Sequence, residues 1–193
     1  MDALECIMTR RSNRKYLAQS VEEKSLEVIV EAGRQAPCGG NSQSCHFIVI
    51  TNEKILNDLA LLVEKEFATW ELYEGMYKSM ANSVRASKNG GYFFHYHAPA
   101  LIVVANKKDY GNAMADSACA VENMLLSANA LGLGGCYINQ LNWLDKDELV
   151  REFMYKLGLL EDETMCAAIS VGHVEAINQK VADRKGNPVT WVK

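Results

Sequence analysis

The sequence predicts a single domain, spanning residues 1–193, in which helices alternate with a few buried strands. Its length suits one domain, and it contains neither repeats nor a composition shift that would mark a second one. Residues 118–131 are almost all apolar or small, which predicts a helix that is buried or lies at a subunit contact. Four short apolar runs predict buried strands: 46–51, 100–106, 136–138 and 166–174.

Composition narrows the class of protein. A hydrophobic content of 49% and a charged content of 23% are typical of a globular domain. The net charge of -4 disfavours nucleic acid as a partner, and no apolar run approaches the roughly 18 residues of a membrane span. The N-terminus, MDALECIMTRRS, is too charged for a secretory signal, so we expect a cytoplasmic protein that does not bind membranes.

Six cysteines are present, and none forms a CxxC pair, which favours free thiols in a reducing compartment. A zinc site built from His95, His97 and scattered cysteines would match no usual ligand spacing, so we expect no metal.

A short helix is predicted over residues 2–9, capped by Asp2, and a basic segment follows it. Residues 10–16, RRSNRKY, contain four cations with a serine and an asparagine between them. Guanidinium groups and a nearby hydroxyl suit the oxygens of a phosphate. A solvated basic surface near a helix end is the alternative.

A capping box of Ser20 and Glu23 predicts a helix that runs to about residue 35, and Pro37 ends it. The following loop, residues 36–43, contains Gly39 and Gly40, so its backbone is able to approach a planar ligand closely. An ordinary connection into strand 46–51 is the alternative.

The middle of the chain is less defined. Residues 54–70 have the apolar spacing of an amphipathic helix, whereas residues 71–89 predict a mobile helix or lid. Four aromatic residues follow, and both core packing and a substrate platform remain open for them: Tyr92, Phe93, Phe94 and Tyr96.

The central apolar helix begins near Asp116, and we expect left-handed backbone at Gly132, Gly134 and Gly135 to end it. Asn139 and Gln140 follow strand 136–138, and the end of a strand is a common place for a ligand, although a core element without one is the alternative. Asp145 is expected to cap a helix to about residue 157. The terminal residues VTWV (189–192) have strand character and, behind a polar linker, are able to join a partner's sheet.

Five motifs, in this order, resemble the flavin-dependent nitroreductase family: RRSNR at 10–14, APCGGNSQ at 36–43, the helix from Asp116 into LGLGG at 131–135, SVGHV at 170–174, and Arg184-Lys185. The resemblance implies an α+β fold with a mainly antiparallel sheet flanked by helices. It also implies an intertwined homodimer with an exchanged C-terminal tail and FMN at each of the two subunit interfaces.

The resemblance also assigns cofactor-binding residues. Arg10, Ser12, Arg184 and Lys185 would hold the phosphate with Arg11 close by, and Arg14 would reach the ribityl chain or the pyrimidine edge. Pro37, Cys38, Gly39 and Asn41 would come from the other subunit, and the backbone of Ile138, Asn139 and Gln140 would lie near flavin N5. No catalytic side chain is implied, since the cofactor carries the hydride.

The family resemblance implies an enzyme in which NADH or NADPH reduces FMN, which then reduces a small electron-poor acceptor such as a nitroaromatic or a quinone. Two alternatives stay open: other flavin chemistry, such as reductive dehalogenation or oxidation of a small ring, and a redox-sensing module acting through Cys38 or Cys136. The chain departs from the family pattern at Ser44-Cys45-His46 and at Cys38, where a hydroxyl residue is common.

Overall fold

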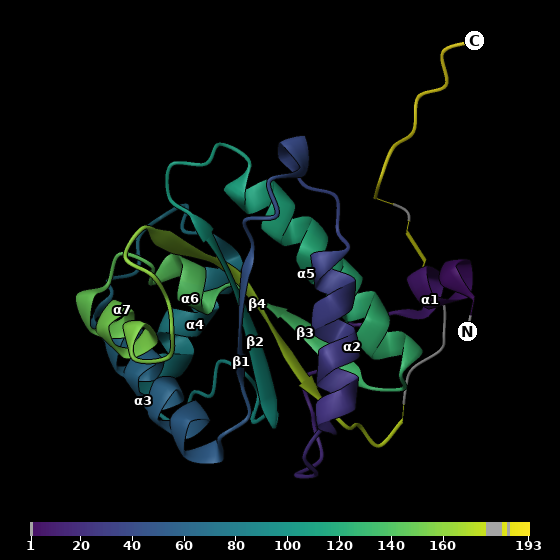
Figure 1. Cartoon of the computed structure of the whole chain (residues 1–193). Coiled ribbons are helices and arrows are strands. Elements are labelled where there is room, and N and C mark those ends of the chain that lie inside the picture. Colours follow the sequence, from purple (N-terminus) through teal and green to yellow (C-terminus); the bar gives the residue numbers. More distant parts are fainter. Residues whose placement is uncertain (1, 177–182, 185) are drawn as a thin grey trace.

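Seven α-helices, one short 3-10 helix and four strands are found in the computed structural model, which describes residues 2–176, 183–184 and 186–193 (Figure 1). In chain order they are α1 (Ala3–Thr9), α2 (Glu23–Arg34), η1 (Gly39–Asn41), β1 (His46–Ile50), α3 (Glu53–Thr69), α4 (Lys78–Asn89), β2 (Ala100–Lys107), α5 (Ala113–Ala130), β3 (Gly134–Ile138), α6 (Gln140–Trp143), α7 (Glu148–Tyr155) and β4 (Glu163–Gly172).

The four strands form one antiparallel sheet in the order β1-β2-β4-β3. Strands β2 and β4 occupy its centre and are apolar and buried along nearly their whole length. The expected α+β class with an antiparallel sheet is therefore confirmed. All four predicted strands are present. β3 starts two residues earlier than expected, and β4 starts three residues earlier and ends two residues earlier.

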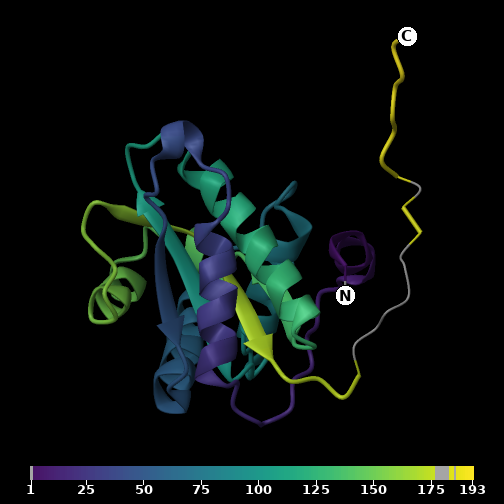
Figure 2. The ribbon, with the colours of Figure 1, turned by 45° about the vertical axis from the view of Figure 1, so that its right-hand side comes forward.

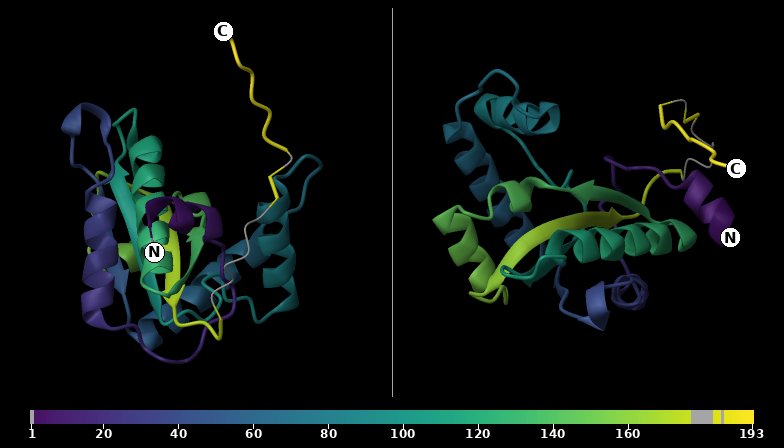
Figure 3. Two further views of the ribbon diagram at one scale, coloured as in Figure 1. Left: turned by 90° about the vertical axis from the view of Figure 1, so that its right-hand side faces the viewer. Right: turned by 90° about the horizontal axis from the view of Figure 1, so that it is seen from above.

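Helices cover both faces of the sheet (Figure 3, right). Alternate residues of β2 point to opposite sides, so that Leu101 and Val103 enter one apolar cluster while Ile102 and Val104 enter the other. The first cluster packs under α3, α4, α6 and α7, and the second packs under α2 and α5. The sheet is thus the middle layer between two helical layers.

Three helices begin after a residue whose side chain caps the first turn. Asp2, Asn52 and Asp147 each accept a backbone N–H from the first turn of α1, α3 and α7. The predicted capping box is wrong, because α2 begins at Glu23 after Glu22, which makes no side-chain cap. Asp145 caps no helix either; its carboxylate instead accepts from Arg151, Thr164 and the Met165 amide.

The glycines after α5 serve two different purposes. Gly132 has a φ of +75° and ends the helix as expected, whereas Gly134 and Gly135 have no left-handed backbone and belong to β3. A Cβ at Gly135 would lie 2.8 Å from a methyl carbon of Leu125, and one at Gly134 would lie 3.0 Å from the Cβ of Asn13. These two glycines therefore let α5 and the N-terminal segment approach β3 closely.

The region predicted as a mobile helix or lid contains one regular helix, α4, which packs against α3. Within the residues that are described, no helix is both long and apolar enough to cross a membrane. The C-terminal residues extend away from the body, and Val189, Trp191 and Val192 are largely exposed (Figures 1 and 2).

Candidate functional site

The basic segment after α1 lies along β3, the edge strand of the sheet. Ser12 forms a parallel bridge with Gly135, and the Asn13 N–H donates to the Gly135 carbonyl at 2.9 Å. The backbone therefore fixes the segment in an extended course, as in a short added strand. Its side chains are not needed for this attachment and remain available for other contacts.

The cations of this segment differ in what holds them. Arg10 forms an ion pair with Glu122 of α5, with 3.4 Å between Nε and Oε1. Arg11 turns back onto the chain, and its Nη1 donates to the carbonyls of Met8 and Arg10. The exposed Ser12 lies beside the Cys136 thiol. Two guanidinium groups and a hydroxyl thus follow one another in the segment that leads from α1 to the edge of β3.

Arg14 points toward the segment between α4 and β2. Its Nε donates to the hydroxyl of Tyr96 at 3.3 Å, and its guanidinium carbon lies 5.7 Å from the centre of the Tyr96 ring. The hydrogen bond to Tyr96 is the largest cause that raises the pKa of Arg14. Nearby, Tyr16 donates to the Asn13 carbonyl at 2.7 Å, so the segment is anchored on both sides of Arg14.

The end of β3 carries a buried polar network. The Gln140 amide donates to the Tyr92 hydroxyl at 2.8 Å and to the Ser83 hydroxyl at 3.3 Å. The Gln140 carbonyl oxygen accepts the Asn139 N–H at 3.1 Å. Tyr92 in turn donates its backbone N–H to Glu64 at 2.8 Å. Gln140 thus connects the strand end to α4 and to the aromatic segment before β2, while Ile138 lies in the apolar core.

The loop that contains Pro37, Cys38, Gly39 and Asn41 packs against the start of α5. Its organising group is the carboxylate of Asp116, which is 7% exposed and accepts the Gly39 N–H at 3.1 Å and the Tyr110 hydroxyl at 2.8 Å. A Cβ at Gly39 would lie 2.2 Å from the Asn112 side chain, so only glycine fits there without a shift. The loop shape is therefore set within the chain.

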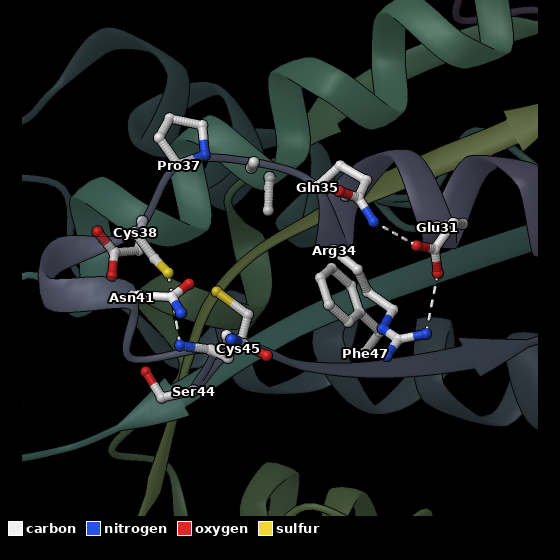
Figure 4. A pocket seen from close by; sticks show the side chains of 14 residues that line it. Glu31, Arg34, Gln35, Pro37, Cys38, Asn41, Ser44, Cys45 and Phe47 are labelled. Carbon is white, nitrogen blue, oxygen red and sulfur yellow. Dashed lines mark hydrogen bonds and ion pairs between the residues drawn. The ribbon is translucent and has the colours of Figure 1, made fainter.

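A cavity of about 430 Å³ lies beside this loop, between the end of α2 and the start of α5. Figure 4 shows Cys38 and Cys45 with their sulfur atoms pointing into the same space, next to Asn41. Burial raises the pKa of the Cys45 thiol, which disfavours the reactive thiolate. Arg34 also borders the cavity but is paired with Glu31 at 2.9 Å.

The structure does not bring the loop and the basic segment together within one chain. The loop contacts Asp116 and Arg10 contacts Glu122, six residues further along α5. Six residues correspond to about 9 Å along a helix and about 120° around it. The two groups of predicted ligands therefore lie on different faces of α5. Arg184 is exposed in the C-terminal segment, and Lys185 lies outside the described residues.

Three features of the site were missed from the sequence. The role of Asp116 could have been predicted, because an acidic residue in a nearly uniform apolar helix needs hydrogen-bond donors when it is buried. The partnership of Arg14 with Tyr96 and that of Gln140 with Tyr92 had none, because they join residues 82 and 48 positions apart. Among the described residues, no group of three or more histidine, cysteine or acidic side chains is placed to hold a metal ion.

An antiparallel sheet between two helical layers defines an α+β domain, in which a basic segment runs along one edge of the sheet. Comparison with known proteins is more specific. The model of the nitroreductase family matches residues 7–173, and the chain belongs to that family.

Three known proteins match this chain over nearly the full length. A crystal structure of a nitroreductase with bound FMN from Bacteroides fragilis is 31% identical, covers 100% of both chains and has a TM-score of 0.86. A Haemophilus influenzae protein provisionally named NAD(P)H nitroreductase is 30% identical over 179 residues, which are 89% of this chain and 88% of the relative. An FMN-bound nitroreductase from Desulfitobacterium hafniense, 24% identical with a TM-score of 0.81 and full coverage of both chains, shares the fold.

Proposed function

We propose that this protein is a cytoplasmic, homodimeric, FMN-dependent oxidoreductase that takes hydride from NADH or NADPH and passes it, in a second step, to an electron-poor acceptor such as a nitroaromatic or a quinone. The observation that carries the proposal is the separation of two half-sites on α5. A two-fold pair of chains is able to join the basic segment of one protomer to the loop of its partner, at two equivalent interfaces. Family membership and the FMN in the Bacteroides fragilis relative support the same conclusion.

The donor set fits the phosphate of FMN. Arg10 and Ser12 offer a guanidinium and a hydroxyl from a backbone that β3 already fixes. The ion pair of Arg10 with Glu122 is partly exposed, and pairs of this kind contribute at most about 1 kcal/mol, so a phosphate is able to replace the carboxylate. Arg184 and Lys185 would add cations from the tail, and Arg11 would add positive potential nearby.

The remaining ligands are proposed to surround the ring. Arg14 would face the pyrimidine edge, where a cation favours the reduced cofactor. The backbone of Ile138, Asn139 and Gln140 would lie near N5. The Asn139 N–H already donates to the Gln140 side chain, so this side chain has to rotate away before the Asn139 N–H is able to contact a ligand. Pro37, Cys38, Gly39 and Asn41 would come from the partner. FMN supplies the hydride chemistry, so no side chain is assigned as acid or base.

The dimer would also use the apolar surface that one chain leaves exposed. Met114, Ala118 and Cys119 form an exposed apolar strip on α5, whose opposite side is buried. The N-terminal segment covers β3, but β1 has no strand on its outer side in the described sheet. A cavity of about 860 Å³ lies between α2 and β1, lined partly by Val30 and Val49. We propose that the partner's residues 189–192 pair with β1 and fill this cavity.

A redox-sensing role through Cys136 is less well supported. Burial is the largest cause that raises the pKa of this thiol, and Cys136 is 1% exposed, so both thiolate formation and access by an oxidant are disfavoured. The choice among acceptors, including reductive dehalogenation or oxidation of a small ring, depends on turnover measurements.

The proposal is tested on the purified full-length chain. We expect flavin absorbance or, after addition of FMN, quenching of flavin fluorescence and a rise in melting temperature. Light scattering should give the mass of a dimer, and Trp191→Ala should shift it toward the monomer. Anaerobic oxidation of NADH or NADPH should require an added nitrofuran or quinone once the bound flavin is reduced. A colourless protein that neither quenches FMN fluorescence nor gains thermal stability would disprove the proposal.

A further inference from the structure

The aromatic segment 90–97 connects the two places where the chain is proposed to hold the flavin ring. Tyr92 bonds Gln140 at the end of β3, and Tyr96 bonds Arg14 in the basic segment. Figure 3 (right) shows α4 and the chain leading into β2 on one side of the sheet, in the layer that also contains α3, α6 and α7. Tyr96 therefore joins an element remote in sequence to the only cation assigned to the ring itself.

The backbone around Tyr96 is held in an unusual conformation. Tyr96 and His97 have φ values of +58° and +56°, a left-handed region that residues with side chains rarely adopt twice in succession. Buried neighbours enforce it: Phe94 is 0% exposed, His95 is 2% exposed, and the rings of Phe93 and His97 stack with centroids 3.8 Å apart. The Tyr96 N–H also donates to the Phe93 carbonyl at 2.9 Å. A conformation fixed at this cost places one side chain, that of Tyr96, against Arg14.

The contact restricts Arg14 in a specific way. The Tyr96 hydroxyl accepts from Nε, which is the guanidinium nitrogen nearest the chain, and the ring face lies under the cation. The two terminal nitrogens remain able to form the paired contacts that guanidinium groups make with anions. Arg14 is otherwise an exposed, long side chain with many rotamers, so losing Tyr96 would release it into solvent.

We propose that Tyr96 is a positioning residue, which holds the Arg14 guanidinium toward the pyrimidine edge of the flavin and thereby sets how strongly the site prefers reduced over oxidised cofactor. The proposal rests on the proposed function and goes beyond it, because it assigns a role to a segment for which core packing and a substrate platform were the two open interpretations. It concerns binding energy and redox potential and requires no contact between Tyr96 and the flavin.

The test measures the midpoint potential of bound FMN and the affinity for oxidised FMN in the full-length protein. Tyr96→Phe removes the hydroxyl and keeps the ring, and Tyr96→Leu removes both. We expect a three- to tenfold loss of the preference for reduced over oxidised flavin in Tyr96→Phe, which for a two-electron couple equals a potential more negative by about 14–30 mV. Tyr96→Leu should shift the potential further, with oxidised FMN still bound.

Two comparisons separate positioning from a general structural effect. In an Arg14→Ala background, Tyr96→Phe should cause no further shift, because a residue that acts through Arg14 has nothing left to position. Tyr155→Phe is the matched control: Arg151 of α7 donates to the Tyr155 hydroxyl at 2.8 Å and lies 5.0 Å from its ring, yet this pair is assigned no flavin contact. It should leave the potential unchanged.

The outcomes are distinct. If Arg14→Ala shifts the potential and Tyr96→Phe does not, or if Tyr96→Phe shifts it equally in both backgrounds, the role of Tyr96 is wrong and the FMN site stands. If the wild-type chain binds no FMN, the proposed function is wrong and the role of Tyr96 is disproved with it.

Discussion

The loop at the start of α5 and the basic segment along β3 are organised by opposite means. In the loop, a buried side chain fixes the structure: the Asp116 carboxylate accepts hydrogen bonds from the Gly39 N–H and the Tyr110 hydroxyl. In the basic segment, the backbone fixes the structure through the bridge between Ser12 and Gly135. The side chain of Arg10 is partly exposed and that of Arg14 is exposed. The loop is held by buried hydrogen bonds to one carboxylate, whereas Arg10 and Arg14 each have a partner at a part-exposed or exposed contact.

This difference bears on the proposal that both regions bind one cofactor. Buried hydrogen bonds fix the shape of the loop and do not attract an anion. Cations on a fixed backbone, in contacts that a ligand is able to replace, attract an anion with little loss of backbone entropy on binding. Substitutions should therefore affect the two regions differently: those in the loop should reduce stability, and those in the basic segment should reduce affinity.

The largest effect is expected for Asp116→Ala. This change removes the acceptor of the Gly39 N–H and leaves the Tyr110 hydroxyl with the Gly39 carbonyl alone. Because two charge-assisted hydrogen bonds are lost at a part-buried site, we expect a loss of about 3–5 kcal/mol in the free energy of unfolding. Urea denaturation followed by circular dichroism measures it. Asp58→Ala is the control, because Asp58 forms only an exposed pair with Lys54 and should change stability by less than about 1 kcal/mol. Equal losses in both variants would contradict the role of Asp116.

His95 is a second buried ionisable group, and it contrasts with Asp116 because burial lowers its pKa. Burial, with nearby His97 as a second cause, lowers the pKa of His95 to about 4. Since the unfolded chain binds this proton near pH 6.5 and the folded chain does not, His95 contributes stability above pH 6.5 that is lost as the pH falls toward 4. The full loss is about 3 kcal/mol.

Unfolding measured in urea between pH 7 and pH 4 tests this dependence. His95→Gln should flatten the curve in that interval, relative to the wild-type chain. If the curve of the His95→Gln variant is as steep as the wild-type curve, other groups cause the acid sensitivity.

In the basic segment, Arg10→Ala should weaken FMN binding by about 1.5–3 kcal/mol, the range for a charge-assisted contact, and should leave the free energy of unfolding nearly unchanged. Fluorescence titration gives the affinity. Lys54→Ala, which removes a cation from α3, is the control for net charge. An unchanged affinity would remove Arg10 from the phosphate site.

The smallest effect is expected for Glu122→Gln. The present partner of Arg10 would lose its charge, so Arg10 would be free to meet the phosphate, and FMN binding should strengthen by no more than about 1 kcal/mol. The gain should disappear in an Arg10→Ala background. Weaker binding instead would show that Glu122 orients Arg10 rather than competing for it.

Much of the fold was predictable because its signals are local. The four strands were found from apolar runs, α3 from the spacing of its apolar residues, and α5 from a long stretch of apolar and small residues. Errors arose where two local signals competed: Ser20 and Glu23 fit a capping box, but the structure begins α2 at Glu23, and Asp145 resembled a cap but bonds β4 instead. The residues before Lys78 gave only a weak pattern, which matches the late start of α4.

The candidate site was predictable only in part, because its geometry depends on contacts between distant residues. The positions of Arg10, Ser12 and Arg14 followed from a motif, but the attachment of this segment to β3 depends on Gly134 and Gly135, whose lack of side chains makes the space. The expectation of left-handed backbone at these two glycines was wrong for the same reason. Tyr96 could not be paired with Arg14 from the sequence, since nothing local marks that contact.

The sheet has one covered edge and one open edge, and this asymmetry limits how copies of the chain associate. Because its own N-terminal segment shields β3, a chain is able to recruit another strand only beside β1. The proposed reciprocal exchange of tails would close after two chains and leave no exposed edge strand. A chain without a partner would keep β1 as an open edge, and open edges promote aggregation. Removal of the tail should therefore increase turbidity rather than yield stable single chains.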